Sequence, residues 1–133
     1  MNVVDSCGWL EYFANGPNAD HFAGPVEGTS DLVVPTLCIY EVFRRLLQQR
    51  GRSEALEAVA AMRQATVVPL TDTLAMEAAA LGHELKLPMA DSVILATARA
   101  FDATLWTQDA DFCSVPGVQY FARAADDGDA GTN

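Results

Sequence analysis

The chain has 133 residues, of which 50% are hydrophobic and 20% charged, and its formal net charge is −10. This length and apolar content predict one globular domain with its own core, and they exclude a largely disordered protein. No apolar run approaches the ~20 residues that a membrane span requires. The first residues lack the pattern of a signal peptide, so we expect a cytoplasmic location and no membrane partner.

The remaining composition excludes several kinds of site. The three cysteines form no CxxC pair and are expected to be reduced thiols, and the two histidines form no HExxH motif. The chain also has no P-loop and no GxGxxG motif. Its acidity argues against a broad electrostatic surface for nucleic acid. Most of the eight basic residues nevertheless fall between Arg44 and Arg63, which leaves room for a local positive face.

Short apolar runs alternate with segments of helical periodicity along the chain. The predicted strands cover residues 2–5, 31–35, 66–70, 103–107 and 118–121. The predicted helices cover residues 7–14, 18–27, 36–50, 54–64, 72–85 and the segment that opens at Pro88, with Ser6 and Thr36 as expected N-caps of the first and third. This alternation predicts an α/β fold in which a mostly parallel central sheet is flanked by helices on both faces. Residues 123–133 are acidic and without periodicity, so we expect one domain over residues 1–122 and a disordered tail.

The stretch from Leu87 to Phe112 is the most informative part of the chain. Its helix is apolar on nearly every face, which is typical of a helix packed inside a domain, and Asp91 is the only charge in its first turns. The strand that follows leads directly into Gln108-Asp109-Ala110-Asp111. Because ligands of open α/β sheets bind at the carboxyl ends of the strands, these residues predict an acidic site.

Four carboxylates share this kind of position at the ends of consecutive elements: Asp5, Glu41, Asp91 and Asp109. Isolated charges in such apolar surroundings are costly, and a hard divalent cation such as Mg²⁺ or Mn²⁺ relieves that cost through oxygen ligands. A bound cation can activate water and neutralise a phosphodiester in its transition state. Ser6 and Thr107, with Asp111, are candidates for orienting the carboxylates or their waters.

Each of these residues also has an ordinary structural explanation. Asp5 can cap the first helix, Asp91 can complement a helix dipole, and Asp109 and Asp111 can be turn residues. Glu41 can pair with Arg44 or Arg45 one turn later. Their joint position favours a metal site over four independent structural roles.

Four blocks of the sequence resemble those of PIN-domain proteins, and more narrowly the VapC-type toxins of bacterial toxin–antitoxin pairs. The blocks are VVDSCGWLEYF, VPTLCIYEVFRRLLQQRG, LPMADSVILATAR and LWTQDADF, and the resemblance covers residues 1 to about 122. It implies a three-layer PIN-like fold and a Mg²⁺- or Mn²⁺-dependent endoribonuclease. It also implies a homodimer that a cognate antitoxin inhibits. The acidic positions of the family fall on Asp5, Glu41, Asp91 and Asp109, with Asp5, Asp91 and Asp109 as the expected metal ligands.

The expected substrate is a structured RNA loop, in tRNA or rRNA, because unpaired loops expose the bases that sequence-selective enzymes read. Arg44 and Arg45 are the candidates for binding its backbone. Two alternatives remain. A phosphatase of the haloacid-dehalogenase type requires Asp-x-Asp after the first strand, where this chain has Cys7 in the third position. A PIN module that binds RNA or protein without catalysis is the other alternative, and the intact carboxylate set argues against it.

Overall fold

The computed structural model describes residues 1–124 and contains five short strands, β1 Asn2–Val4, β2 Val33–Pro35, β3 Thr66–Val68, β4 Thr104–Thr107 and β5 Gln119–Tyr120. All of their pairings are parallel. The strands form a sheet of order β1-β4-β5 and a pair β2-β3, and a parallel bridge between Asn2 and Leu32 joins the two. The prediction of a mostly parallel sheet is therefore confirmed. The tail beyond residue 124 lies outside the described residues.

The strand order places β1 at the centre, with β2 and then β3 on one side and β4 and then β5 on the other. The chain therefore first moves outward from β1 to β3 and then returns to the opposite side of β1. A reversal of this kind leaves a crevice at the carboxyl ends of the two strands that flank it, here β1 and β4.

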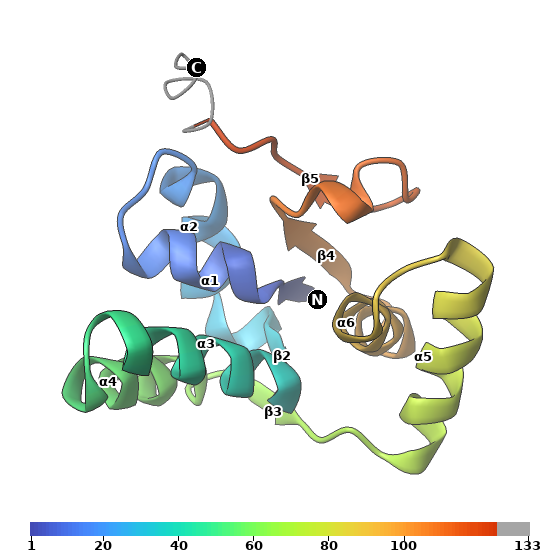
Figure 1. Ribbon diagram of the computed structural model, residues 1–133, viewed down its shortest axis with the longest axis horizontal. Helices are drawn as coiled ribbons and strands as arrows, with labels where there is room; N and C mark the ends of the chain where they lie inside the picture. Colours follow the sequence, from blue (N-terminus) through green and yellow to red (C-terminus); the bar gives the residue numbers. More distant parts are fainter. Residues whose placement is uncertain (125–133) are drawn as a thin grey trace.

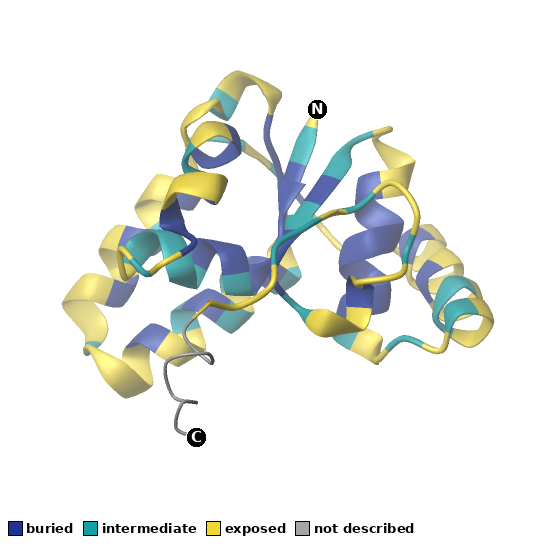
Figure 2. Cartoon of the chain, turned by 90° about the horizontal axis from the view of Figure 1, so that it is seen from above, coloured by how far each residue is buried: buried dark blue, intermediate teal, exposed yellow. Residues whose placement is uncertain are grey.

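Helices cover both faces of the sheet (Figures 1 and 2). Their bounds are α1 Ser6–Phe13, α2 Ala19–Glu27, α3 Thr36–Gln49, α4 Arg52–Met62, α5 Asp72–Leu85 and α6 Met89–Ala100, with 3-10 turns η1 Thr29–Asp31 and η2 Ala110–Phe112. Helix α6 packs against β1, β2 and β4 on one face, with α5 outside it, while α1 to α4 lie on the other face. None of the helices in residues 1–124 is long and apolar enough to cross a membrane.

The core confirms the prediction of an interior helix. In α6 every residue from Asp91 to Ala98 is buried, and Ile94 has no exposed surface. The strands contribute β-branched residues with no exposed surface, among them Val3, Val4, Val33 and Val34. Burial on both faces explains why these strands are continuously apolar rather than alternating.

Several local predictions were wrong at the ends of elements. The strand expected over residues 66–70 ends at Val68, and the helix expected over residues 54–64 is Arg52–Met62. Asp5, not Ser6, caps α1, because its side chain accepts a hydrogen bond from the Ser6 N–H at 2.7 Å. Thr36 is the first residue of α3 rather than its cap, and no side chain caps that helix. The strand expected from residue 31 begins only at Val33, because Asp31 lies in the turn η1, where its N–H donates to the Gly28 carbonyl at 3.0 Å.

Candidate metal centre

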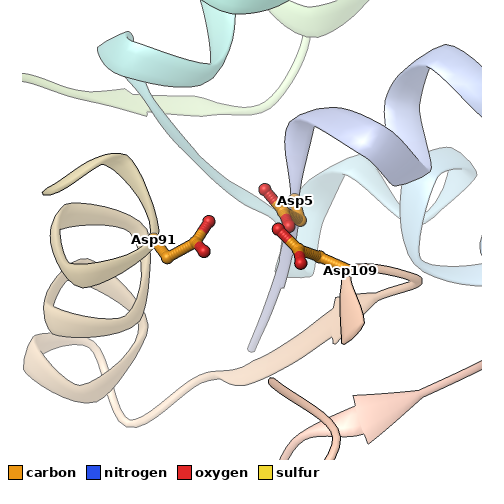
Figure 3. Close-up of side chains that lie close together, drawn as sticks. All are labelled: Asp5, Asp91 and Asp109. Carbon is orange, nitrogen blue, oxygen red and sulfur yellow. The ribbon is translucent and has the colours of Figure 1, made fainter. Parts of the chain in front are cut away.

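Three of the four expected carboxylates converge from separate elements of the fold. Asp5 follows β1, Asp109 follows β4, and Asp91 lies in the first turn of α6. Each offers an oxygen atom, and these three atoms lie within 4.8 Å of one another (Figure 3). Because β1 and β4 are parallel neighbours, their carboxyl ends meet at one edge, and α6 crosses the same crevice with its N-terminal turn.

The cluster is buried enough to perturb its own ionisation. Asp5 is 4% exposed and Asp91 is 8% exposed. Burial, with repulsion from Asp109, raises the pKa of Asp5 to about 6. Burial raises the pKa of Asp91 to about 8, and repulsion from Asp109 and then Asp5 adds to the effect. Three carboxylates that repel one another in a shielded site fit a hard divalent cation such as Mg²⁺ or Mn²⁺.

Thr107 connects two members of the cluster. Its side chain has no exposed surface. The hydroxyl group donates to Asp5 Oδ2 at 2.8 Å and accepts the Asp109 N–H at 2.9 Å. These two bonds orient the Asp5 carboxylate and the start of the loop that carries Asp109, as expected of a residue that supports metal ligands.

Glu41 lies in the same pocket but outside the group of three aspartates. The Ser6 hydroxyl donates to Glu41 Oε1 at 2.5 Å and so orients Glu41, while the Ser6 N–H donates to Asp5. The predicted alternative, an ion pair of Glu41 with Arg44 or Arg45, is wrong, since within residues 1–124 the one ion pair joins Arg50 and Glu54.

Asp111 is exposed and belongs to the turn η2. Its N–H donates to Asp109 Oδ1 at 2.9 Å, so Asp111 helps to hold Asp109 through its backbone. Its side chain and its charge also contribute, as the smaller causes, to the raised pKa of Asp91. Asp111 therefore lies beside the group of three aspartates rather than in it.

The carboxylates open into a cavity of about 470 Å³ between α1 and α3. Arg44 and Arg45 line it, as does Arg123, which sequence reasoning missed.

Cys7, also missed as a site residue, donates its thiol hydrogen to Asp5 Oδ2 at 3.4 Å, and burial raises the pKa of this thiol to about 12. The position of Cys7 two residues after Asp5, in the first turn of the same helix, was the available signal. Arg123 carried no such signal in the sequence, because only the fold brings it to the pocket.

A family model for the PIN domain matches residues 3–118, and the chain belongs to the PIN-domain family. No curated protein sequence matches the chain.

Solved structures of similar fold include proteins of toxin–antitoxin systems. A toxin–antitoxin complex from Klebsiella pneumoniae is 21% identical, with a TM-score of 0.74 over 89% of this chain and 95% of that one. VapC20 from Mycobacterium tuberculosis, described as a sarcin–ricin loop cleaving toxin, is 18% identical, with a TM-score of 0.71 over 90% and 98%. VapBC2 from Rickettsia felis, solved on a fragment of promoter DNA, is 13% identical, with a TM-score of 0.70 over 91% and 97%. At these identities the similarity shows a shared fold.

Proposed function

We propose that this chain is the toxin of a toxin–antitoxin pair and a Mg²⁺- or Mn²⁺-dependent endoribonuclease. The observation that carries the proposal is the convergence of Asp5, Asp91 and Asp109 at the crevice of a PIN domain. Pure binding of RNA gives no reason to bring three acids together, two of them buried, because each would repel the phosphate backbone as well as the others. A bound cation would neutralise the repulsion among the acids and attract the phosphate of the substrate.

Each residue of the site has a distinct part in the proposed reaction. Asp5, Asp91 and Asp109 would hold the cation, which supplies Lewis acidity for the phosphodiester and its attacking water. Thr107 holds the Asp5 carboxylate and the loop that carries Asp109 in fixed positions through its two hydrogen bonds. Glu41, oriented by Ser6, offers a carboxylate that can accept a hydrogen bond or a proton from water in the same pocket.

The substrate that the pocket supports best is a single-stranded loop of a structured RNA, in tRNA or rRNA. Exposed Arg44 and Arg45 on α3 line the cavity and offer guanidinium groups to the phosphates of an unpaired strand. The named activity of VapC20, a toxin of similar fold, supports an RNA loop as the target.

Partners and location follow from the same proposal. The similar structures from Klebsiella pneumoniae and Rickettsia felis contain toxin–antitoxin complexes, so we expect an antitoxin that covers the acidic pocket. Such a segment would place Arg or Lys against the aspartates and compete with the cation. We also expect a homodimer, a hetero-oligomer with the antitoxin, and action in the cytoplasm, where the RNA targets are.

The test is a cleavage assay on a total RNA pool with Mg²⁺, with Mn²⁺ and with chelator, for the parent and for Asp91→Asn. We expect discrete cuts only with metal, and at least a hundredfold loss in Asp91→Asn, roughly the cost of removing one preorganised electrostatic group. Asp20→Asn is the matched control, since Asp20 is an exposed acid in the first turn of α2 and lies outside the pocket.

Cleavage that survives in chelator, or that Asp91→Asn retains at the parent's rate, would overturn the proposal. Retention of RNA binding without any cut in the parent would favour the non-catalytic binding module instead.

A further inference from the structure

The chain after β5 is fastened to the domain just before it reaches the pocket. The Phe121 N–H donates to the Thr107 carbonyl at 2.9 Å. The Phe121 ring stacks on His21 with centroids 4.3 Å apart, and it also contacts Phe22 and Trp106, at 5.7 and 6.1 Å between centroids. This segment therefore runs back from the sheet toward α2 along a defined path (Figures 1 and 2).

Asn18 makes the last attachment. It occupies the N-cap position of α2, where an asparagine side chain normally accepts a hydrogen bond from the helix, but it makes no capping bond. Its amide group, on a residue only 6% exposed, instead donates to Gln108 Oε1 at 3.0 Å and to the Ala122 carbonyl at 2.9 Å.

Glu11 holds the other side of this arrangement. It accepts the Asn18 N–H at 2.7 Å and the Gln108 side-chain amide at 3.3 Å. We refer to Glu11, Asn18 and Gln108 together as the Asn18 clamp. Asn18 and Gln108 are buried, and their hydrogen bonds are satisfied within the network, so the backbone at Ala122 is held relative to α1 and to the loop after β4.

The residue that follows this attachment is Arg123, which is exposed and lies at the carboxylate pocket as one of its lining residues. Arg44 and Arg45 line it from α3, so cationic groups reach the pocket from two separate elements. None of these three arginines forms an ion pair within residues 1–124. Three of the eight basic residues of an acidic chain thus gather around one cavity.

We propose that Arg123, positioned by the Asn18 clamp, binds a backbone phosphate of the RNA strand in the pocket. The strand would then be held between α3 and the segment after β5, with the aspartates beneath it. The inference rests on the proposed ribonuclease function and adds a binding residue to it. A guanidinium group suits phosphate because its N–H groups form paired, charge-assisted hydrogen bonds.

The first test measures binding of a fluorescein-labelled, mixed-sequence single-stranded RNA by anisotropy, in Mg²⁺ and across a salt series. All variants carry Asp91→Asn so that the RNA stays intact. We expect Arg123→Gln to weaken binding about tenfold, the scale of one charge-assisted hydrogen bond, and to lower the salt slope by about 0.7. Arg99→Gln is the matched control, because exposed Arg99 at the end of α6 lies outside the pocket. Equal affinity and slope for Arg123→Gln and Arg99→Gln would overturn the proposal.

The second test asks whether Asn18 acts through Arg123. Asn18→Ala should also weaken binding and lower the salt slope, although it changes no charge. The double variant Asn18→Ala/Arg123→Gln should bind no more weakly than Arg123→Gln alone, because a shared effect is not additive. Additive losses would show that Asn18 does not position Arg123. Melting temperatures of all variants distinguish a specific loss of RNA binding from a general loss of stability.

Failure of this inference is distinguishable from failure of the ribonuclease proposal. A parent that cleaves RNA with metal, combined with an Arg123→Gln variant that binds like its control, would overturn the role of Arg123 alone. A parent that neither binds nor cleaves RNA would overturn both.

Discussion

At the scale of single residues, the site depends on hydroxyl groups that hold carboxylates in place. Thr107 donates to Asp5 and accepts from the backbone of Asp109, while Ser6 donates to Glu41. A lone aspartate rotates freely about its side-chain bonds. These hydroxyl groups remove that freedom before any cation arrives, which lowers the entropy cost of binding it.

Thr107→Val tests this role, because it keeps the shape and removes both hydrogen bonds. We expect affinity for Mn²⁺, measured by calorimetry, to fall roughly tenfold to a hundredfold, as is typical when a residue that supports a metal ligand is lost. Thr97→Val is the matched control, since Thr97 is also buried and its hydroxyl donates to the Val93 carbonyl at 2.8 Å, away from the site. If both variants bound Mn²⁺ as the parent does, Thr107 would have no part in the metal centre.

At the scale of elements, the site forms where β1, β4 and α6 meet, and α1 must pack closely for Asp5 to lie there. Gly8 permits this packing. A Cβ atom added at Gly8 would lie 2.7 Å from Val4 Cγ1 and 2.8 Å from Phe22 Cε1, and both of those side chains have no exposed surface. Helix α1 would therefore have to move away from β1 and α2.

We expect Gly8→Ala to lower the free energy of unfolding by about 1–3 kcal/mol, the usual cost of overpacking a core. Gly24→Ala in α2 is the comparison variant, since its added Cβ would meet nothing within 4 Å apart from its chain neighbours. Its cost should be smaller and limited to local crowding against Pro25, the next residue in the helix. Urea denaturation measures both, and a Gly8→Ala variant as stable as Gly24→Ala would contradict the packing described for α1.

The element scale also shows what a sequence can predict. The helix after Pro88 and the strand before Gln108 were predictable because their apolar pattern reflects burial, and the aspartates because they lie at the ends of such elements. Both Asp5 and Ser6 were possible caps of α1 from the sequence, and only the contact of the Ser6 hydroxyl with Glu41 decides between them. The bond from Asn18 to Ala122 joins residues 104 positions apart, so no local pattern contains it.

At the scale of the whole molecule, the buried aspartates couple stability to pH. A carboxyl whose pKa is raised by folding favours the protonated form, so its contribution is favourable at low pH and is lost as the pH rises through the raised pKa. For Asp5 and Asp91 these values are about 6 and about 8, against an ordinary value of 3.8. In chelator, the contribution of these two groups therefore declines between about pH 4 and about pH 8.

We expect the melting temperature of the parent in chelator to be lower at pH 8.5 than at pH 5.5, and Mn²⁺ to reverse most of that difference. A melting temperature that is independent of pH in chelator would contradict the repulsion inferred at this site. Circular dichroism on two samples at each pH, one with chelator and one with Mn²⁺, measures these melting temperatures.

The most direct test of the metal centre compares melting of the parent and Asp91→Asn at pH 7.5, in chelator and in Mn²⁺. In chelator at pH 7.5, folding of the parent must either protonate Asp91, whose pKa is raised to about 8, or keep its charge beside Asp5 and Asp109. Asn requires neither at nearly the same shape, so we expect the variant in chelator to be as stable as the parent or more so, by about 1 kcal/mol or roughly 4 °C. Mn²⁺ should raise the melting temperature of the parent by several degrees and that of the variant much less. A variant that is less stable in chelator, yet gains as much from Mn²⁺ as the parent, would show that Asp91 is a structural residue and that these aspartates do not form a metal centre.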